Sequence, residues 1–367
     1  MSSETVKAND IKWPEIFSLG ALNVSVVISW IAYHEYQPIL LENFKFDHLA
    51  DFLIISKGII LVIIPALAGL LADYMLGKKG KYFTLFTVGI GATAMIFMIV
   101  ASIIGAGPVG TLKPFLPYMI ILWLVSMNLF ISPAYSMIEA FAPAQKLPIV
   151  MGFLFLVTEL IYALEPLVVG LVQFFGDTLT FVVGGILISV SGYFFHKISS
   201  DEVISRKKEL LEARDKKVSL ESYIAIIVIG LALGIGKAFL VEYIPADFEA
   251  NFPDLGNTGD YVSFGLLGLS AIIAFLISKK VATWNTQKVL MTSLIIMGVG
   301  TMILLFSWSV AVSIAGGIIT AIGFSILNIS GLPFAINQLS VKHITYGVGV
   351  YIGASEVCTG FFEYYFR

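Results

Sequence analysis

Ionisable side chains inside long apolar runs are the residues of this sequence with the clearest capacity for chemistry. They are Glu35, Lys57, Glu159, Glu165, Lys237, Glu242, Glu356 and Glu363, with His34 beside the first. A charged group at membrane depth is costly, so it indicates function by default. A carboxylate placed between apolar surroundings, which favour its neutral form, and a lysine, which favours its charged form, can take up and release protons. We therefore predict proton coupling at four carboxylates: Glu35, Glu159, Glu242 and Glu356.

Two alternatives stay open for part of this set. Glu35 and Glu242 each precede a proline by three residues at matched positions, and could instead cap a bent helix end. A divalent metal carrier could use Glu35, His34 and Glu242, although neighbouring residues point about 100° apart around a helix. We predict no resident metal and no cofactor.

Long apolar runs must position these groups. A membrane span needs roughly 20 mostly apolar residues, and the sequence predicts about eleven such helices. They lie at about 16–43, 50–76, 82–105, 114–141, 147–175, 178–197, 220–246, 259–279, 286–308, 310–336 and 343–366. Continuous hydrophobicity over this length favours helices over the alternating strands of a barrel. The predicted fold class is an all-α polytopic membrane protein.

The composition excludes several other classes of protein. Apolar residues make up 58% of the chain and charged residues 13%, far from the balance of a water-soluble domain. The net charge of −3 offers no basic surface for nucleic acid, and the single cysteine, Cys358, excludes a disulfide framework. The sequence has no histidine pair at metal spacing, no phosphate-binding glycine loop and no serine nucleophile motif. We expect a lipid bilayer as the surrounding partner and no enzymatic activity.

Basic residues indicate the orientation of the chain. On one side of the predicted membrane they occupy the N-terminus, the polar segment 199–219 and the loops with Lys78, Lys146 and Lys279, whereas the other side holds Lys45, Lys113 and Arg367 with an acidic loop around 247–260. Basic loops stay in the cytoplasm. We therefore predict a cytoplasmic N-terminus and linker, in the plasma (inner) membrane of a prokaryote.

The two halves of the chain resemble each other. The element around Glu35, Tyr36 and Pro38 recurs around Glu242 and Tyr243, and other matched pairs follow at a similar offset of about 200 residues. We predict an N-terminal six-helix bundle over 1–198, a linker over 199–219 and a C-terminal five-helix bundle over 220–367. Parallel repeats of this kind are typical of transporters whose substrate site lies between the halves.

Two helical bundles, a basic central linker and the loop Gly69-Leu70-Leu71-Ala72-Asp73 through Gly77-Lys78-Lys79 resemble the major facilitator superfamily. The resemblance covers nearly the whole chain at the level of architecture. The Gly-Pro motif of drug–proton antiporters is absent, since Ala163-Leu164-Glu165-Pro166 stands in its place. Eleven spans leave the family's twelfth helix absent from the chain.

The resemblance implies a central cavity and a gate between the bundles. In the family, helices 1, 4, 7 and 10 line the cavity, which makes substrate-binding candidates of Asn23, Trp30, Tyr33, Trp123, Asn128, Tyr135 and Asn328. Lys57 would face Glu356 or Glu363 across the seam between the halves. The full set of candidates for gate ion pairs is Lys57, Glu363, Glu165 and Lys237. Glu159 and Glu165 do not share a face of a straight helix, so we expect different roles for them.

The predicted function is secondary active transport of a small neutral or cationic organic solute by alternating access, coupled to protons as symport or antiport. Arginine, which suits bidentate recognition of phosphate or carboxylate, is absent from the predicted spans. The excess of carboxylates over lysines in the spans favours a cationic or neutral solute. A divalent-metal or other cation carrier is the alternative, and a transporter-like receptor a further one. We expect a monomer whose partners are the solute and a coupling ion, the proton.

Overall fold

Helices account for nearly the whole structure, a computed structural model that describes residues 10–79, 83–108, 110–212 and 218–365. The first half holds α2 (Trp13–Asn43), α3 (Ala50–Lys79), α4 (Thr84–Ala106), α5 (Leu116–Ser136), α6 (Ile138–Phe141), α7 (Leu147–Ala163) and α8 (Glu165–Glu212). The second half holds α9 (Leu220–Ala238), the π-helix η4 (Phe239–Tyr243), α10 (Ile244–Asn251), α11 (Thr258–Val281), α12 (Thr286–Leu305), α13 (Val310–Gln338) and α14 (Ile344–Tyr365).

The long apolar helices correspond to the spans predicted from the sequence. In the described residues, 10 helical segments are long and apolar enough to cross a membrane. The eleventh predicted span, 343–366, corresponds to α14, whose 22 residues also suffice to span a bilayer. The all-α polytopic fold is therefore confirmed.

The predicted spans 147–175 and 178–197 differ in detail from the structure. α7 ends at Ala163, and α8 begins at Glu165 and contains a sharp turn at Gly176, whose φ of 74° and ψ of 170° are not helical. The Asp177 carboxylate accepts a hydrogen bond of 2.6 Å from the Thr178 backbone N–H directly after this turn. Glycine adopts positive φ without the steric cost of a side chain, which explains the turn at this residue. The break at Leu164 was not predicted.

The start of the predicted linker is a helical extension of α8, which continues to Glu212. Val203 is fully buried, and Glu202 forms an ion pair with Lys12 before the start of α2. Residues 213–217 lie outside the described part of the chain. The first part of segment 199–219 is thus packed on the N-terminal half.

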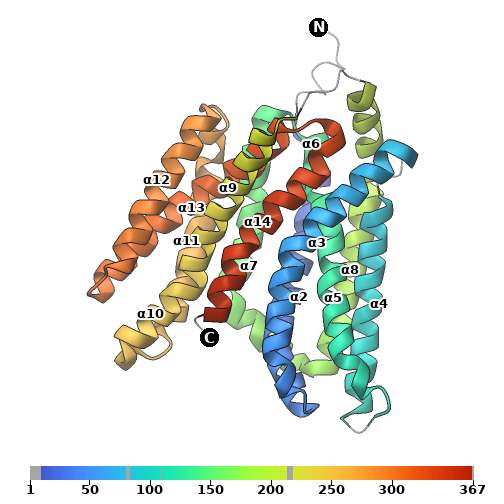
Figure 1. The fold of residues 1–367 in the computed structure, drawn as a ribbon, viewed down its shortest axis with the longest axis vertical. Helices are drawn as coiled ribbons and strands as arrows, with labels where there is room; N and C mark the ends of the chain where they lie inside the picture. Colours follow the sequence, from blue (N-terminus) through green and yellow to red (C-terminus); the bar gives the residue numbers. More distant parts are fainter. Residues whose placement is uncertain (1–9, 80–82, 109, 213–217, 366–367) are drawn as a thin grey trace.

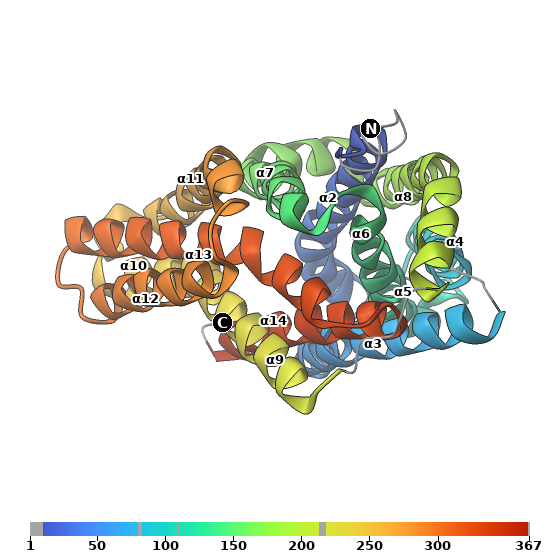
Figure 2. The ribbon, with the colours of Figure 1, turned by 90° about the horizontal axis from the view of Figure 1, so that it is seen from above.

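The two halves lie side by side with their long helices roughly aligned (Figure 1). Seen from above, α14 lies beside α3, and α7 lies beside α11, at two seams between the halves (Figure 2). The repeat predicted from the sequence pairs α3 with α11 and α7 with α14. We call the face with the start of α2 and the end of α8 the linker side, and the opposite face the far side.

Small residues allow the backbones of α3 and α14 to approach closely. A Cβ atom added at Gly349 or Gly353 of α14 would collide with backbone atoms of α3, and one added at Gly69 of α3 would collide with the Thr345 carbonyl. Glycines four residues apart share a helix face and favour such close crossings in membranes. The seam between α3 and α14 is therefore a backbone-to-backbone contact.

Candidate functional site

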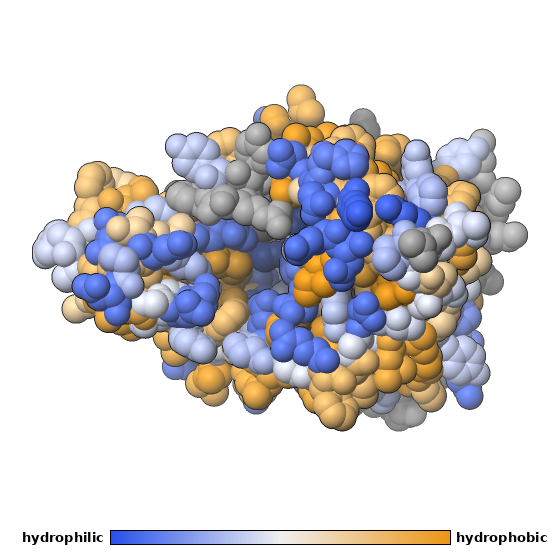
Figure 3. Space-filling model, turned by 90° about the horizontal axis from the view of Figure 1, so that it is seen from below, coloured by the Kyte–Doolittle hydropathy of each residue, from blue (hydrophilic) through white to orange (hydrophobic). Residues whose placement is uncertain are grey.

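A cavity of about 670 Å³ lies between the two halves. Side chains from α2, α3, α5, α7, α8, α9, η4, α10, α11, α13 and α14 line it. Its lining reaches the far-side ends of the helices at Gln37, Pro38 and Pro245, and Figure 3 shows a hollow between the halves on this face. This size is within the range of roughly 300–1,000 Å³ that suits small organic ligands.

The cavity is closed toward the linker side by contacts between the halves. Asp73 of α3 accepts hydrogen bonds from the backbone N–H groups of Thr345, at 3.3 Å, and Tyr346, at 2.8 Å. The Thr345 hydroxyl donates to the Ser136 hydroxyl of α5 at 3.2 Å. Asp73 is buried, and its charge lies at the N-terminus of α14, where the helix dipole favours an anion. These bonds join the halves on the linker side.

This arrangement gives a structural role to part of the loop motif seen in the sequence. Gly69 allows the close backbone contact and Asp73 caps α14, a partner 272 residues away that the sequence alone did not indicate. The side chains of Gly77, Lys78 and Lys79 lie outside the described part of the structure. Their role in the motif stays a prediction.

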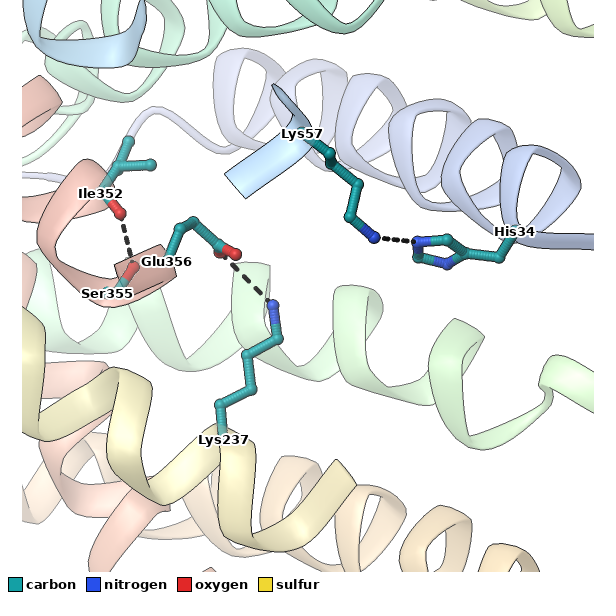
Figure 4. Close-up of polar contacts among 6 residues, drawn as sticks. All are labelled: His34, Lys57, Lys237, Ile352, Ser355 and Glu356. Atoms are coloured by element: carbon teal, nitrogen blue, oxygen red, sulfur yellow. Dashed lines mark hydrogen bonds and ion pairs between the residues drawn. The ribbon is translucent and has the colours of Figure 1, made fainter. Parts of the chain in front are cut away.

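Two polar pairs from different halves point into the cavity (Figure 4). Lys237 of α9 and Glu356 of α14 form an ion pair at 3.4 Å between Nζ and Oε1. The Nζ atom of Lys57 on α3 lies 3.3 Å from the Nε2 atom of His34 on α2. Each pair lies within one half. Glu356, one of the two expected partners of Lys57, is thus paired with Lys237 in the described residues.

Glu363 was the other expected partner of Lys57. The structure describes the backbone of Glu363 in α14 but not its side chain. The ion pair between Lys57 and Glu363 therefore stays a prediction.

Glu159 is the most deeply placed of the predicted coupling carboxylates. Its side chain lines the cavity from α7 and is 9% exposed. Within the described residues it makes no hydrogen bond or ion pair, although Lys237 and Tyr162 lie within electrostatic range. A buried carboxylate without a direct partner is costly in its charged form. It is therefore available to a proton or to a ligand that enters the cavity.

Glu35 and Glu242 occupy matched positions in the two halves but have different surroundings. Glu35 accepts a hydrogen bond of 2.8 Å from Gln173 of α8 and does not line the cavity, whereas Glu242 does. Glu242 lies in the π-helix η4, Phe239–Tyr243, while Glu35 lies in a regular stretch of α2. A π-turn holds an extra residue and changes the direction of the side chains that follow. This accounts for the difference between the halves.

Glu165 lines the cavity together with Glu159, although a straight helix would direct the two apart. The break at Leu164 between α7 and α8 removes the straight-helix spacing on which that expectation rested. Glu165 lies within electrostatic range of Asp260 on α11, which also lines the cavity. Asp260 entered the sequence reasoning only as part of an acidic loop.

The predicted substrate-binding residues divide into two groups. Those that line the cavity are Asn23, Trp30, Asn128, Tyr135 and Asn328. Tyr33 and Trp123 are buried outside the lining, with their rings stacked at 4.7 Å and an interplanar angle of 14°. Trp30 packs edge-on against both, at 5.6 Å from Tyr33 and 5.0 Å from Trp123. The buried pair therefore supports Trp30, which faces the cavity.

Hydrogen bonds within the N-terminal half hold parts of the lining in place. The Asn23 side-chain amide donates to the Tyr135 hydroxyl at 2.9 Å, which joins α2 to α5. The Asn128 amide donates to the Leu124 carbonyl one turn earlier at 2.8 Å. Sequence reasoning missed Tyr162 of α7, although it lies three residues after Glu159 and hence on the same helix face. That spacing was the available signal.

The acidic groups of the cavity do not form a metal site. In the residues that the structure describes, no three His, Cys, Asp or Glu side chains gather closely enough to hold a metal ion. His34 and Glu242 line the cavity while Glu35 bonds Gln173. The three residues of the proposed metal alternative are therefore not brought together.

Comparisons with solved structures place this architecture in a known fold. The chain matches the human organic anion transporter MFSD10 (TETRAN) with a TM-score of 0.66 and 10% identity, over 95% of this chain and 91% of that one. It matches the major facilitator superfamily (MFS) proton:xylose symporter XylE with a TM-score of 0.61 and 13% identity, over 97% and 89%. It matches the MFS transporter FucP in the outward conformation with a TM-score of 0.67 and 11% identity, over 96% of both chains.

The chain thus has the major facilitator superfamily fold, as the sequence resemblance implied. No protein-family model matches the sequence. No curated protein matches it either. At these identities the structural likeness defines the fold, and the solute has to be argued from the cavity itself.

Proposed function

We propose that this protein is a secondary active transporter that moves a small neutral or cationic organic solute across a membrane by alternating access, coupled to protons. One observation carries the proposal. A cavity of about 670 Å³ between the two halves reaches the far side, is closed on the linker side, and contains the buried carboxylate of Glu159.

The contacts on the linker side support alternating access. A transporter of this kind must open the closed side when the other side closes. Among the described residues, the linker-side contacts include hydrogen bonds around Asp73, Ser136 and Thr345 and close backbone packing at glycines. Such contacts can separate at modest cost, because each hydrogen bond contributes about 0.5–1.5 kcal/mol net. The repeat predicted from the sequence supports a second arrangement, in which the linker side opens and the far side closes.

Proton coupling is the proposed role of Glu159, with the Lys237–Glu356 pair beside it. Glu159 can bind a proton in the apolar cavity and lose it when the cavity becomes hydrated. Lys237 lies within electrostatic range of Glu159 while paired with Glu356 at 3.4 Å. A change in the charge of Glu159 therefore alters how strongly Lys237 is attracted to Glu159 and to Glu356. Glu242 is the second coupling candidate that lines the cavity.

The charge of the cavity supports a neutral or cationic solute. Acidic residues in the lining outnumber the lysines Lys57 and Lys237. Among the structural neighbours, MFSD10 is an organic anion transporter and XylE a proton:xylose symporter, so the shared fold does not select one class of solute. The charge of the cavity lining therefore indicates the class of solute better than the shared fold does.

The basic residues near the N-terminus and in segment 199–219 support a cytoplasmic linker side in the inner membrane of a prokaryote. On this orientation the far side is extracellular, so the proposed transporter is a monomer in an outward-facing state.

A disulfide lock tests this proposal. Because Ser136 and Thr345 are bonded at 3.2 Å between their hydroxyls, cysteines at both positions can form a disulfide that holds the linker side closed. A Cys358→Ser background removes the native thiol. Solutes are first selected by thermal stabilisation at about pH 5.5 and pH 7.5, since a ligand of the folded state raises its stability. Uptake is then measured in proteoliposomes with an imposed proton gradient.

The oxidised Ser136→Cys/Thr345→Cys protein should show no uptake and should recover it after reduction. Each single cysteine variant is the matched control and should be insensitive to oxidant. Uptake by the oxidised lock at the unlocked rate would overturn alternating access. Uptake that is independent of the proton gradient would overturn the coupling.

A further inference from the structure

Glu159 differs from the other predicted coupling carboxylates in how its charge is balanced. Glu356 is paired with Lys237 at 3.4 Å, and Glu35 accepts a hydrogen bond from Gln173 at 2.8 Å. Glu159 has no such direct bond within the described part of the chain, although it is 9% exposed and lines the cavity. An unpaired buried carboxylate gains most from a cation that arrives with a ligand.

Lysine does not supply that cation directly. Lys237 is the nearest identified candidate, but its Nζ atom is bonded to Glu356 rather than to Glu159. Lys57 lies beside His34 on the opposite half of the protein. A ligand cation can therefore occupy the position next to Glu159 without displacing an existing ion pair.

Aromatic side chains line the same cavity on α7 and on the helices beside it. Tyr162 and Phe155 lie three and four residues from Glu159 on α7, so all three share a helix face. The Phe155 ring packs edge-on at 5.6 Å against Phe324 of α13, which also lines the cavity. Tyr135 of α5 lies within electrostatic range of Glu159. A carboxylate among aromatic faces is the chemistry that recognises organic ammonium groups, through charge attraction and cation–π contact.

We infer that the solute is an organic cation of the ammonium type, whose charged group binds at Glu159 among the rings of Tyr135, Phe155, Tyr162 and Phe324. This inference rests on the proposed transport function and narrows its substrate class. The apolar remainder of the cavity accepts the body of the ligand, and the amides of Asn128 and Asn328 supply polar contacts.

The same geometry has a consequence for coupling. A carboxylate that binds a proton loses the charge that holds the ammonium group, so the proton and the solute exclude each other at Glu159. Mutual exclusion at one site corresponds to exchange of a proton for the cation rather than to their joint transport.

Other charged and titratable groups line the same cavity on the helices around Glu159. They are His34 on α2, Lys57 on α3, Tyr135 on α5, Tyr162 on α7, Glu165 on α8, Lys237 on α9, Glu242 on η4, Asp260 on α11, and Tyr351 and Glu356 on α14. The pH dependence of binding must therefore be assigned to Glu159 by substitution, not from the wild-type profile alone.

The test uses a pair of probes with the same shape and different charge. These are 4-hydroxyphenyltrimethylammonium and 4-tert-butylphenol, in which carbon replaces the charged nitrogen. Binding to the purified full chain in lipid nanodiscs is measured by isothermal titration calorimetry at about pH 7.5 and pH 5.5. Buffers of different ionisation enthalpy report the protons released on binding.

The cation should bind at least about tenfold more tightly than its neutral isostere, and more weakly at the lower pH. Glu159→Gln should remove this preference and the proton release that accompanies binding at the lower pH. Glu159→Asp keeps the charge and should retain a preference for the cation. Glu249→Gln, an exposed carboxylate on α10 outside the lining, is the matched control and should behave as the wild type.

Equal binding of the two probes, or an unchanged preference in Glu159→Gln, would overturn the inference. Melting curves identify a variant that has not folded, and Glu159→Asp then decides the question. The disulfide lock between Ser136→Cys and Thr345→Cys separates this failure from failure of the proposed function. A lock that blocks uptake of another solute, while the cation does not bind, refutes the ammonium assignment and leaves the transporter assignment intact.

Discussion

Replacement of Asp73 should weaken the closed state of the linker side by a predictable amount. Asp73 accepts hydrogen bonds from two backbone N–H groups at the start of α14, at 3.3 and 2.8 Å, and is 7% exposed. Loss of a helix N-cap costs about 0.5–2 kcal/mol, and the charge at a helix N-terminus contributes up to about 2 kcal/mol in partly buried geometries. Asp73→Asn keeps one acceptor oxygen and loses the charge, whereas Asp73→Ala loses both.

We therefore expect Asp73→Ala to destabilise the closed linker side by about 1–2 kcal/mol, and Asp73→Asn by less. A change of that size alters the ratio of closed to open protein by roughly 5- to 30-fold. Hydrogen exchange of peptides that cover 341–350 measures the ratio, because these amides become exposed when α14 separates from α3. Exchange should accelerate by a similar factor.

Asp51→Asn is the matched control for this prediction. Asp51 is an exposed carboxylate in the first turn of the same helix, at its far-side end. It should leave exchange over 341–350 unchanged. If Asp73→Ala exchanges at the wild-type rate in this segment while both proteins remain folded, the carboxylate does not hold the halves together and the reasoning is wrong.

Three further predictions test other parts of the structure. Lys237→Gln and Glu356→Gln should each destabilise the protein by about 1 kcal/mol, because each single change leaves an unpaired charge in the cavity. The double variant should be destabilised by less than the sum of the two. A double-mutant cycle in thermal unfolding measures this, and exact additivity would contradict the ion pair. Gly349→Leu should lower the melting temperature by at least several degrees, because the new side chain collides with the α3 backbone. Gly298→Ala should not, because no atoms lie within 4 Å of the added Cβ. Equal melting temperatures of the two variants would refute the close contact between α3 and α14. Asp247→Ala should accelerate hydrogen exchange in α10, since it removes the 3.1 Å bond from Ser313 that ties α10 to α13, and unchanged exchange there would show that α10 is held by other contacts.

Hydrophobic length and the internal repeat were sufficient to predict most of the fold. Apolar runs of about 20 residues must be helical in a membrane because unpaired backbone groups cannot be left in lipid. The positions of α11 to α14 follow the predicted spans to within a few residues. The break at Leu164 stands directly before Glu165-Pro166, and a proline biases the residue before it away from helical conformation, a signal that the prediction from apolar length did not use. The positive φ of Gly176 falls where two predicted spans meet.

The candidate site could be predicted only in part, because partners depend on tertiary contacts. Glu159 and Glu356 were identified from their depth in apolar runs, yet the partner of Glu356 depended on which helix lies beside α14. The difference between Glu35 and Glu242 depended on the π-helix η4, which the repeat pattern cannot reveal. Local sequence indicates which residues are costly in a membrane, and the packing decides what each one contacts.

Alternating access is the central claim, and distances between the halves test it most directly. Spin labels at Ile204→Cys and Trp284→Cys, both exposed near the linker side, report one end of the molecule in a Cys358→Ser background. Labels at Ile39→Cys and Leu255→Cys, both exposed near the far side, report the other. Double electron–electron resonance at about pH 5.5 and pH 7.5, with and without a stabilising solute, should show the two distances changing in opposite directions. Distances that stay fixed, or that change together, would contradict the account.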